Sequence, residues 1–147
     1  MNSREPTSEV ASLLDRYLID LDDTKLDDAW ARSLFTEDAR IVFPMSAHEG
    51  IDGLAAYHRD ALAAFERTQH INSPAVVDLT GGDRARLRAN LVSTHVHHPD
   101  AAQEQLFVAG TLTTGEARRT PGGWRLSELS FRVVWTTGVP PRQGASG

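Results

Sequence analysis

The stretch "RARLRANLVSTHVHH" from Arg84 to His98 alternates apolar and polar residues with a period of two. This period is typical of a strand with one buried face. The odd positions begin with four apolar residues and continue through Ser93, His95 and His97. The even positions begin with three arginines and an asparagine, which fits an outer face in water. We therefore expect His95 on the inner face of the strand and His98 on the outer face.

More long strands flank this one and are separated by turn residues. One runs from Gln69 to Thr80 and closes at "GGD", and another runs from about Gln105 to Arg118 and turns at "TPGG". The last strand is Trp124 to Thr137. Large apolar residues at alternate positions mark its inner face: Leu129, Phe131, Val133 and Trp135. The glycine- and proline-containing tail, residues 139–147, is expected to be disordered.

The N-terminal half has helical periodicity instead. Residues 8–22 carry an apolar stripe with a 3.6-residue period, and Asp27–Phe35 and Ile51–Arg67 predict two more helices. A brief strand is expected from Arg40 to Phe43, and residues 1–7 are expected to be flexible.

Helices followed by a series of long strands predict an α+β fold. The sheet has to curl around the helices, because its apolar face has nothing else to pack against. A curled sheet with helices across its open side makes a cone with one mouth, where a small ligand would bind. Neither a repeat nor a linker divides the chain, so residues 8–138 are expected to form a single domain.

Composition excludes several classes of function. The net charge of −5 argues against a nucleic-acid or membrane-surface binder, since both need a basic face. The chain has no cysteine, which excludes disulfides, thiolate metal sites and a cysteine nucleophile. The polar first residues do not resemble a signal peptide, and no apolar run approaches the ~20 residues of a membrane span. We therefore expect a cytoplasmic protein with no membrane partner.

His70 lies in "RTQHINSP", Arg67 to Pro74, near the start of a predicted strand. Strict alternation puts it on the face opposite Val77. A proline within a strand usually marks an edge or a bulge, however, and a one-residue bulge at Pro74 would bring His70 to the inner face. Periodicity leaves both placements open.

Several other polar residues have alternative interpretations. The helical wheel puts Asp20 and Asp22 at the two edges of the apolar stripe and does not choose between them. His97, His98 and Asp100 are expected at a solvated strand end. The alternative is a metal site using His95 and His97, for which no third ligand is evident.

Three histidine- and tyrosine-bearing positions are expected to be structural. His58 is predicted to pack its helix against the sheet, and Tyr17 and Tyr57 are predicted to be core residues with their hydroxyls at the mouth.

The segments "LDDTKLDDAW", "LFTEDARIVF", "TQHINS", "GDRARLRANLVSTH", "GGWRL" and "VVWTTG" resemble the SnoaL-like branch of the NTF2-like superfamily. This branch includes scytalone dehydratase, polyketide cyclases and relatives of ketosteroid isomerase. The resemblance covers about residues 8–138 in the right order. It implies a cone-shaped, cystatin-like α+β barrel with a mostly antiparallel sheet, and a homo-oligomer, either a dimer or a trimer.

The resemblance to the dehydratase also implies site residues. Its catalytic aspartate matches Asp22, and its two histidines match His70 and His95. Where the dehydratase has tyrosines that hold a water or carbonyl oxygen, this chain has Leu21 and Phe43. Where the dehydratase has a pocket asparagine, this chain has Thr113.

These residues lead to the hypothesis of an acid–base enzyme that needs neither a cofactor nor a metal. Histidine titrates near neutral pH, so a facing pair can supply a base and an acid. We expect Asp22 to orient His95, with His70 facing both across the pocket. The reaction would be a dehydration, an isomerisation or a ring closure of a cyclic or polyketide-like carbonyl compound. Eight residues are expected to contact the substrate: Tyr17, Phe43, Tyr57, Leu91, Phe107, Thr113, Phe131 and Trp135.

Two other functions are compatible with the sequence. A non-catalytic ligand-binding or accessory protein is favoured by Leu21 and Phe43 in place of polar groups. A partner subunit of a larger enzyme is disfavoured, because the chain is short and has no evident docking extension.

Overall fold

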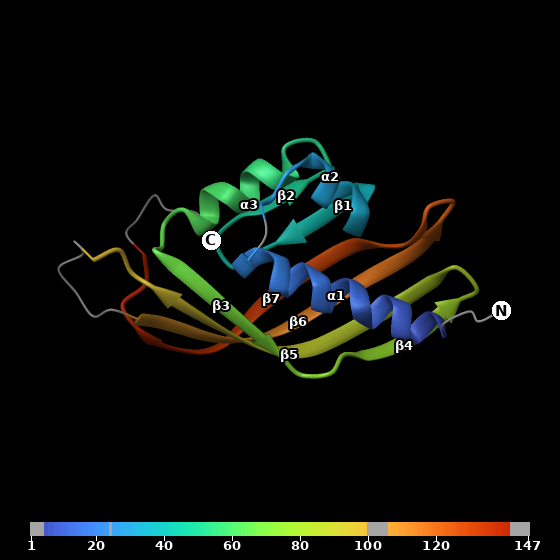
Figure 1. The fold of residues 1–147 in the computed structure, drawn as a ribbon. Helices are drawn as coiled ribbons and strands as arrows, with labels where there is room; N and C mark the ends of the chain where they lie inside the picture. The colour runs from blue at the N-terminus through green and yellow to red at the C-terminus, as the bar shows by residue number, and fades with distance from the viewer. Residues whose placement is uncertain (1–4, 24, 100–105, 142–147) are drawn as a thin grey trace.

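The computed structural model describes residues 5–23, 25–99 and 106–141 and contains three helices and seven strands (Figure 1). The helices are α1 (Pro6–Asp23), α2 (Asp28–Leu34) and α3 (Leu54–Leu62). The strands are β1 (Phe35–Val42), β2 (Ala47–Glu49), β3 (Arg67–Asn72), β4 (Val76–Gly81), β5 (Arg84–Val96), β6 (Leu106–Thr120) and β7 (Gly123–Gly138).

All seven strands belong to one curved sheet, and the predicted α+β class is confirmed. The order is β2-β1-β7-β6-β5-β3, and β4 pairs with β5 beyond the end of β3. Neighbours are antiparallel except β1 and β7, which are parallel. The predicted outer face of β5 is confirmed, because Arg84, Arg86 and Arg88 are exposed while the residues between them are buried.

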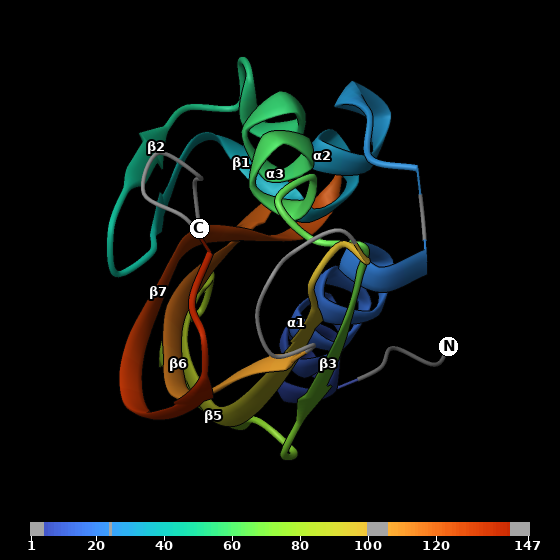
Figure 2. The same cartoon turned by 90° about the vertical axis from the view of Figure 1, so that its left-hand side faces the viewer.

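Two extra residues in β7 help to bend the sheet. Gly110 pairs with Trp135 while Thr111 pairs with Val133, so Val134 has no partner in β6. A second shift lies between Glu116 and Ala117. Bulges of this kind increase strand twist and curvature. Figure 2 shows the resulting curved sheet, with α1 on its concave side and α3 above it.

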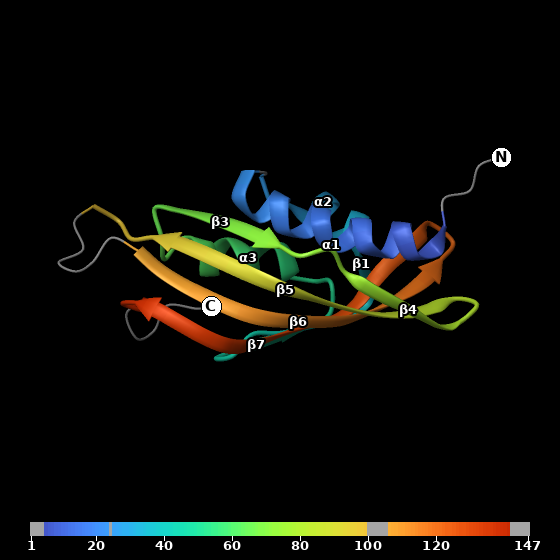
Figure 3. The ribbon, with the colours of Figure 1, turned by 90° about the horizontal axis from the view of Figure 1, so that it is seen from below.

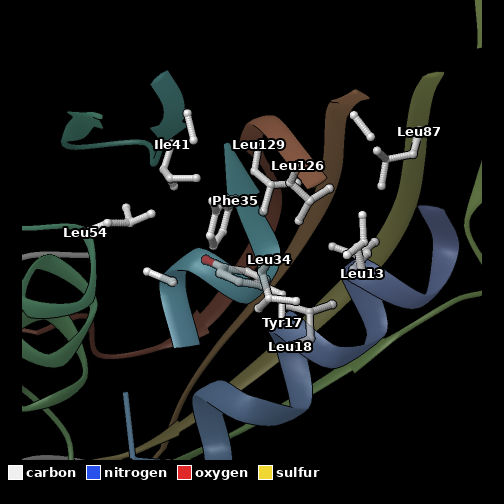
Figure 4. Packing of buried hydrophobic residues seen from close by; sticks show 14 of the residues in the cluster. Leu13, Tyr17, Leu18, Leu34, Phe35, Ile41, Leu54, Leu87, Leu126 and Leu129 are labelled. Carbon is white, nitrogen blue, oxygen red and sulfur yellow. The ribbon is translucent and has the colours of Figure 1, made fainter. Parts of the chain in front are cut away.

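The core lies between α1 and the concave face of this sheet. Figure 3 shows α1 running along the sheet. Val10, Leu14 and Leu18 are at most 1% exposed and recur at the helical spacing that the sequence shows. They pack with side chains from α2, β1 and β7, including Leu34, Phe35 and Leu129 (Figure 4).

The structure corrects the predicted bounds of several elements. The third helix covers only Leu54–Leu62, because the backbone N–H of Glu66 already pairs with the carbonyl of Val96 in the sheet. The predicted strand Arg40–Phe43 is the end of the longer β1, and β2 was not predicted. Helix α1 begins at Pro6, inside the segment expected to be flexible. Proline favours this first turn because its fixed φ suits a helix and its missing N–H has no helical partner there.

Candidate active site

A cavity of about 560 Å³ opens at the mouth of the cone, between α1 and the inner faces of β5, β6 and β7. Its lining is mainly apolar and includes Tyr17, Leu21, Phe43, Leu91, Phe107 and Phe131. Phe43 and Phe131 are stacked, with ring centroids 4.8 Å apart and planes 8° apart. His70, Ser93 and His95 are the polar groups that β3 and β5 contribute to this lining.

Asp22 and His70 form a tight pair at the edge of the cavity. The Nδ1 atom of His70 lies 2.7 Å from Oδ1 of Asp22, and the backbone N–H of His70 donates to Oδ2 at 2.7 Å. The hydroxyl of Thr68 donates to Oδ1 at 2.9 Å. The side chains of His70 and Asp22 are 9% and 16% exposed. Both oxygens of the carboxylate are therefore used to hold β3 and its histidine.

The electrostatics of the pair fix the tautomer of His70. Partial burial raises the pKa of the Asp22 carboxyl, but hydrogen bonds from the ring and backbone of His70, the charge of His70 and the Thr68 hydroxyl outweigh it. The net result is a pKa below the ordinary value, so Asp22 is a carboxylate at neutral pH. A carboxylate only accepts hydrogen bonds, so Nδ1 of His70 carries the proton, and in the neutral ring Nε2 carries a lone pair.

A change of register between β3 and β4 puts His70 on the inner face. In β3, His70 pairs with Ser93, and in β4, Val77 pairs with Leu87. The break at Ser73–Pro74 therefore contains one extra residue relative to β5. Strict alternation from Val77 would have turned His70 outward, and the bulge alternative places it correctly.

His95 lies beside His70 but makes a different contact. The two rings are perpendicular, with centroids 6.3 Å apart. Nδ1 of His95 donates to the carbonyl of Phe107 at 2.9 Å, so Nε2 of the neutral ring is an acceptor. Burial lowers the pKa of His95 below its ordinary value and outweighs the Phe107 hydrogen bond, and the charges of His70 and His97 lower it further.

The expectation that Asp22 orients His95 is wrong, because Asp22 pairs with His70. The reason is topological: β3 is the strand beside the C-terminal end of α1, so the backbone, ring and neighbouring Thr68 of β3 all reach the carboxylate. His95 lies one strand further in and binds the backbone of β6 instead.

Five of the eight residues expected to contact a substrate line the cavity: Tyr17, Phe43, Leu91, Phe107 and Phe131. The other three, Tyr57, Thr113 and Trp135, do not. The hydroxyl of Tyr57 lies 2.6 Å from that of Ser46. Thr113 is 0% exposed, and its hydroxyl has no hydrogen-bond partner within the described part of the chain.

Trp135 was predicted on the inner face and lies on the outer one. The unpaired Val134 reverses the alternation of β7, so Thr136 lines the cavity in its place. The indole covers Gly110, where an added Cβ would overlap its Nε1 atom, and Trp135 is 47% exposed.

Tyr17 and His58 form a second buried pair beneath the cavity. The hydroxyl of Tyr17 lies 2.8 Å from Nε2 of His58, whose Nδ1 lies 2.9 Å from the carbonyl of Leu54. Burial lowers the pKa of His58 to about 4 and raises that of Tyr17, so both are neutral. Nδ1 of His58 therefore donates to Leu54, and Tyr17 donates to Nε2. The predicted packing of His58 is confirmed, but the Tyr17 hydroxyl lies in the core and not at the mouth.

A SnoaL-like domain model matches residues 3–130 of the chain. The chain belongs to the SnoaL-like family. This match covers the predicted domain almost completely, and a search of curated proteins gives no match.

Solved structures share the fold of this SnoaL-like protein. The Kfla4162 protein of Kribbella flavida is 24% identical, with a TM-score of 0.80, over 88% of this chain and 91% of that one. A protein of Novosphingobium aromaticivorans, provisionally assigned as a scytalone dehydratase, is 19% identical with a TM-score of 0.75 over 90% and 87%. The hexachlorocyclohexane dehydrochlorinase LinA-type3 of Novosphingobium barchaimii is 17% identical with a TM-score of 0.75 over 95% and 93%. NTF2-like and cystatin-like structures also match, which confirms the predicted fold class.

The residues after β5 were predicted to form a solvated strand end, and His97 differs from this prediction. His97 is buried, and its Nε2 donates to the carbonyl of Val139 at 2.6 Å, so the chain from Val139 to Pro141 is held at the cavity mouth. This segment was expected to be disordered. His98 is exposed, as predicted, and Asp100 lies outside the described residues.

Among the residues described, no group of three or more His, Asp or Glu side chains could hold a metal ion, and no helix could cross a membrane.

Sequence reasoning did not select three hydroxyl residues of the cavity lining, Ser93, Thr111 and Thr136. Thr111 is 9% exposed and its hydroxyl is unpaired among the described residues. The alternation of residues between the two faces of a strand could have identified Ser93 and Thr111. Ser93 follows Leu91 on the inner face of β5, and Thr111 pairs with Leu91.

Proposed function

We propose that this SnoaL-like protein is a small acid–base enzyme of the dehydratase, cyclase or isomerase type. The observation that carries the proposal is the Asp22–His70 pair, in which the carboxylate engages Nδ1 of a histidine that lines a largely apolar cavity. A base of this kind needs no cofactor to remove a proton next to a carbonyl group.

The proton follows a short path in this proposal. Nε2 of His70 takes a hydrogen from the carbon alpha to the carbonyl, and Asp22 stabilises the imidazolium that forms. The electron pair left on carbon forms the enolate. The imidazolium then returns the proton, either to another carbon in an isomerisation or to a leaving hydroxyl, which departs as water. His95, held neutral by burial, accepts a hydrogen bond from a substrate hydroxyl.

The size and lining of the cavity support a flat cyclic compound as the ligand. Its volume of about 560 Å³ is within the usual range for small-molecule sites. The stacked Phe43 and Phe131 give it one flat aromatic side. This supports a cyclic or polyketide-like carbonyl compound as the substrate class.

The test is a screen of cyclic ketones and β-hydroxyketones for loss of water and for exchange of α-hydrogens in D₂O. We expect the wild-type protein to catalyse at least one reaction, and His70→Gln to lose about 10²–10⁴-fold in rate. His98→Gln is the matched control, because His98 is exposed, and it should keep the wild-type rate. Equal rates for His70→Gln and wild type would contradict the proposal.

A non-catalytic binding protein is the second candidate. It is favoured by Leu21 and Phe43, which put apolar side chains into the cavity lining. Tight binding of a cyclic ketone without turnover in the same screen would select it.

We also propose that the protein is a cytoplasmic homo-oligomer, either a dimer or a trimer. Light scattering of the purified protein measures the oligomeric state.

A further inference from the structure

Ser93 is a neighbour of both histidines in the sheet. It pairs with His70 across β3 and β5, and His95 follows two residues later on the same face of β5. The side chains of residues i and i+2 lie on one face of a strand. Ser93 is 6% exposed and lines the cavity together with both imidazoles.

Ser93 and His70 form a non-hydrogen-bonded pair, the type of antiparallel pair in which the two residues lie closer together. The backbone N–H of His70 points away from β5, because it donates to Asp22. In an antiparallel ladder this identifies a non-hydrogen-bonded pair, whose Cα atoms are about 4.5 Å apart and whose side chains are close. On its other side, Ser93 pairs with Ala109 of β6, which also lines the cavity and leaves space next to the hydroxyl.

The hydroxyl of Ser93 can donate a hydrogen bond to a ligand, which Nε2 of a neutral imidazole cannot do. With His70 and His95 neutral, each Nδ1 proton is already donated, to Asp22 and to the Phe107 carbonyl, so both Nε2 atoms only accept. A carbonyl oxygen in the cavity needs a donor. Within residues 5–23, 25–99 and 106–141, no hydrogen bond engages the Ser93 hydroxyl, so its proton is available.

We propose that Ser93 is a catalytic residue that donates its hydroxyl proton in a hydrogen bond to the carbonyl oxygen of the substrate. The hydrogen bond polarises the carbonyl and stabilises the enolate oxygen that forms when Nε2 of His70 removes the α-hydrogen. The inference rests on the proposed function and narrows the substrate. Its carbonyl must lie beside Ala109, and its α-carbon must face His70.

The experiment uses α-tetralone and 1-indanone, two bicyclic ketones labelled with ¹³C at the carbonyl carbon. NMR measures the exchange of their α-hydrogens in D₂O and the ¹³C shift of the bound carbonyl. Ser93→Ala should exchange about 10²-fold more slowly than wild type, and its bound carbonyl should lose the downfield shift. Ser93→Thr should restore part of both. The matched control is Thr94→Ala, which removes the next hydroxyl of β5, at an even position on the outer face of the strand.

Variant His70→Gln separates the two proposals. It should lose exchange but keep the downfield carbonyl shift, because the Ser93 donor remains. An unchanged carbonyl shift in Ser93→Ala, with thermal unfolding like that of wild type, overturns the role of Ser93 and leaves His70 as the base. Exchange that persists in His70→Gln overturns the proposed function instead. Failure of both ketones to bind the wild-type protein overturns the substrate class and the role of Ser93 with it.

Discussion

At the scale of single residues, the position of Asp22 is unfavourable for the helix that carries it. A carboxylate in the last turn of a helix faces the negative end of the helix dipole, and α1 has no basic residue there. Three donors from β3 offset this cost: the ring and backbone of His70 and the hydroxyl of Thr68. This arrangement fits a residue kept for chemistry more than one kept for stability.

The first prediction concerns the charge of Asp22. Asp22→Asn keeps the shape of the side chain but removes the charge that stabilises the imidazolium of His70. We expect α-hydrogen exchange to slow by about 10²–10⁴-fold with little change in ketone affinity. Asp23→Asn is the matched control, since Asp23 is the next residue of α1 and its side chain is exposed. If the two variants exchange at the same rate, Asp22 does not act through its charge.

The second prediction concerns the pH dependence of stability. The pKa of His58 is about 4 in the folded protein and about 6.5 in the unfolded chain. The unfolded chain therefore binds a proton that the folded protein does not bind between these values. Stability should be intact above pH ~6.5 and fall by up to about 3 kcal/mol as the pH drops to ~4.

Urea unfolding at several pH values measures this effect. His58→Gln should be less stable at pH 7 but should lose less stability on acidification, because glutamine does not titrate. His98→Gln should follow the wild-type curve. If the free energy of unfolding of His58→Gln falls with pH as steeply as that of wild type, other groups cause the acid sensitivity.

At the scale of elements, the two extra residues of β7 and the break between β3 and β4 decide which side chains reach the cavity. Alternation correctly assigned the faces of β5, because β5 pairs with β6 without a shift over its whole length. It failed at Trp135, where Val134 reverses the parity of β7. A bulge depends on how two strands pair, so the sequence of one strand does not reveal it. Pro74 was the one local signal, and it indicated the β3–β4 break.

The third prediction tests the contact that holds Trp135 outside. Gly110→Ala adds a Cβ that would overlap the indole, and it should destabilise the protein by about 1–3 kcal/mol. In a Trp135→Ala background, the same change should cost much less, because the overlapping ring is gone. Urea unfolding of the four proteins gives the coupling energy. A cost that is independent of Trp135 would place the indole elsewhere.

At the scale of the whole molecule, helices cover part of the concave face of the bent sheet and leave a cavity beside α1. The order of helices and strands was enough to predict this shape, because the apolar face of the sheet requires a cover. The partner of Asp22 was not predictable in the same way. It depends on which strand lies beside the end of α1, and the sequence does not state the strand order.

The fourth prediction tests whether the cavity is the binding site. Ala109→Phe adds a ring to the space beside Ser93 and should abolish ketone binding while the protein stays folded. Val108→Phe is the matched control, since residue 108 points to the other face of β6. Titrations with labelled α-tetralone measure both variants. Binding by Ala109→Phe with unchanged affinity would place the ligand elsewhere.

The most direct test of the account is the ¹⁵N NMR spectrum of the histidine rings at neutral pH. We predict that His70 has a protonated Nδ1 and an unprotonated Nε2, and that the Nδ1 signal changes in Asp22→Asn but not in Asp23→Asn. A His70 ring protonated on Nε2 alone would contradict the account, because that nitrogen would have no lone pair with which to remove a proton from a substrate.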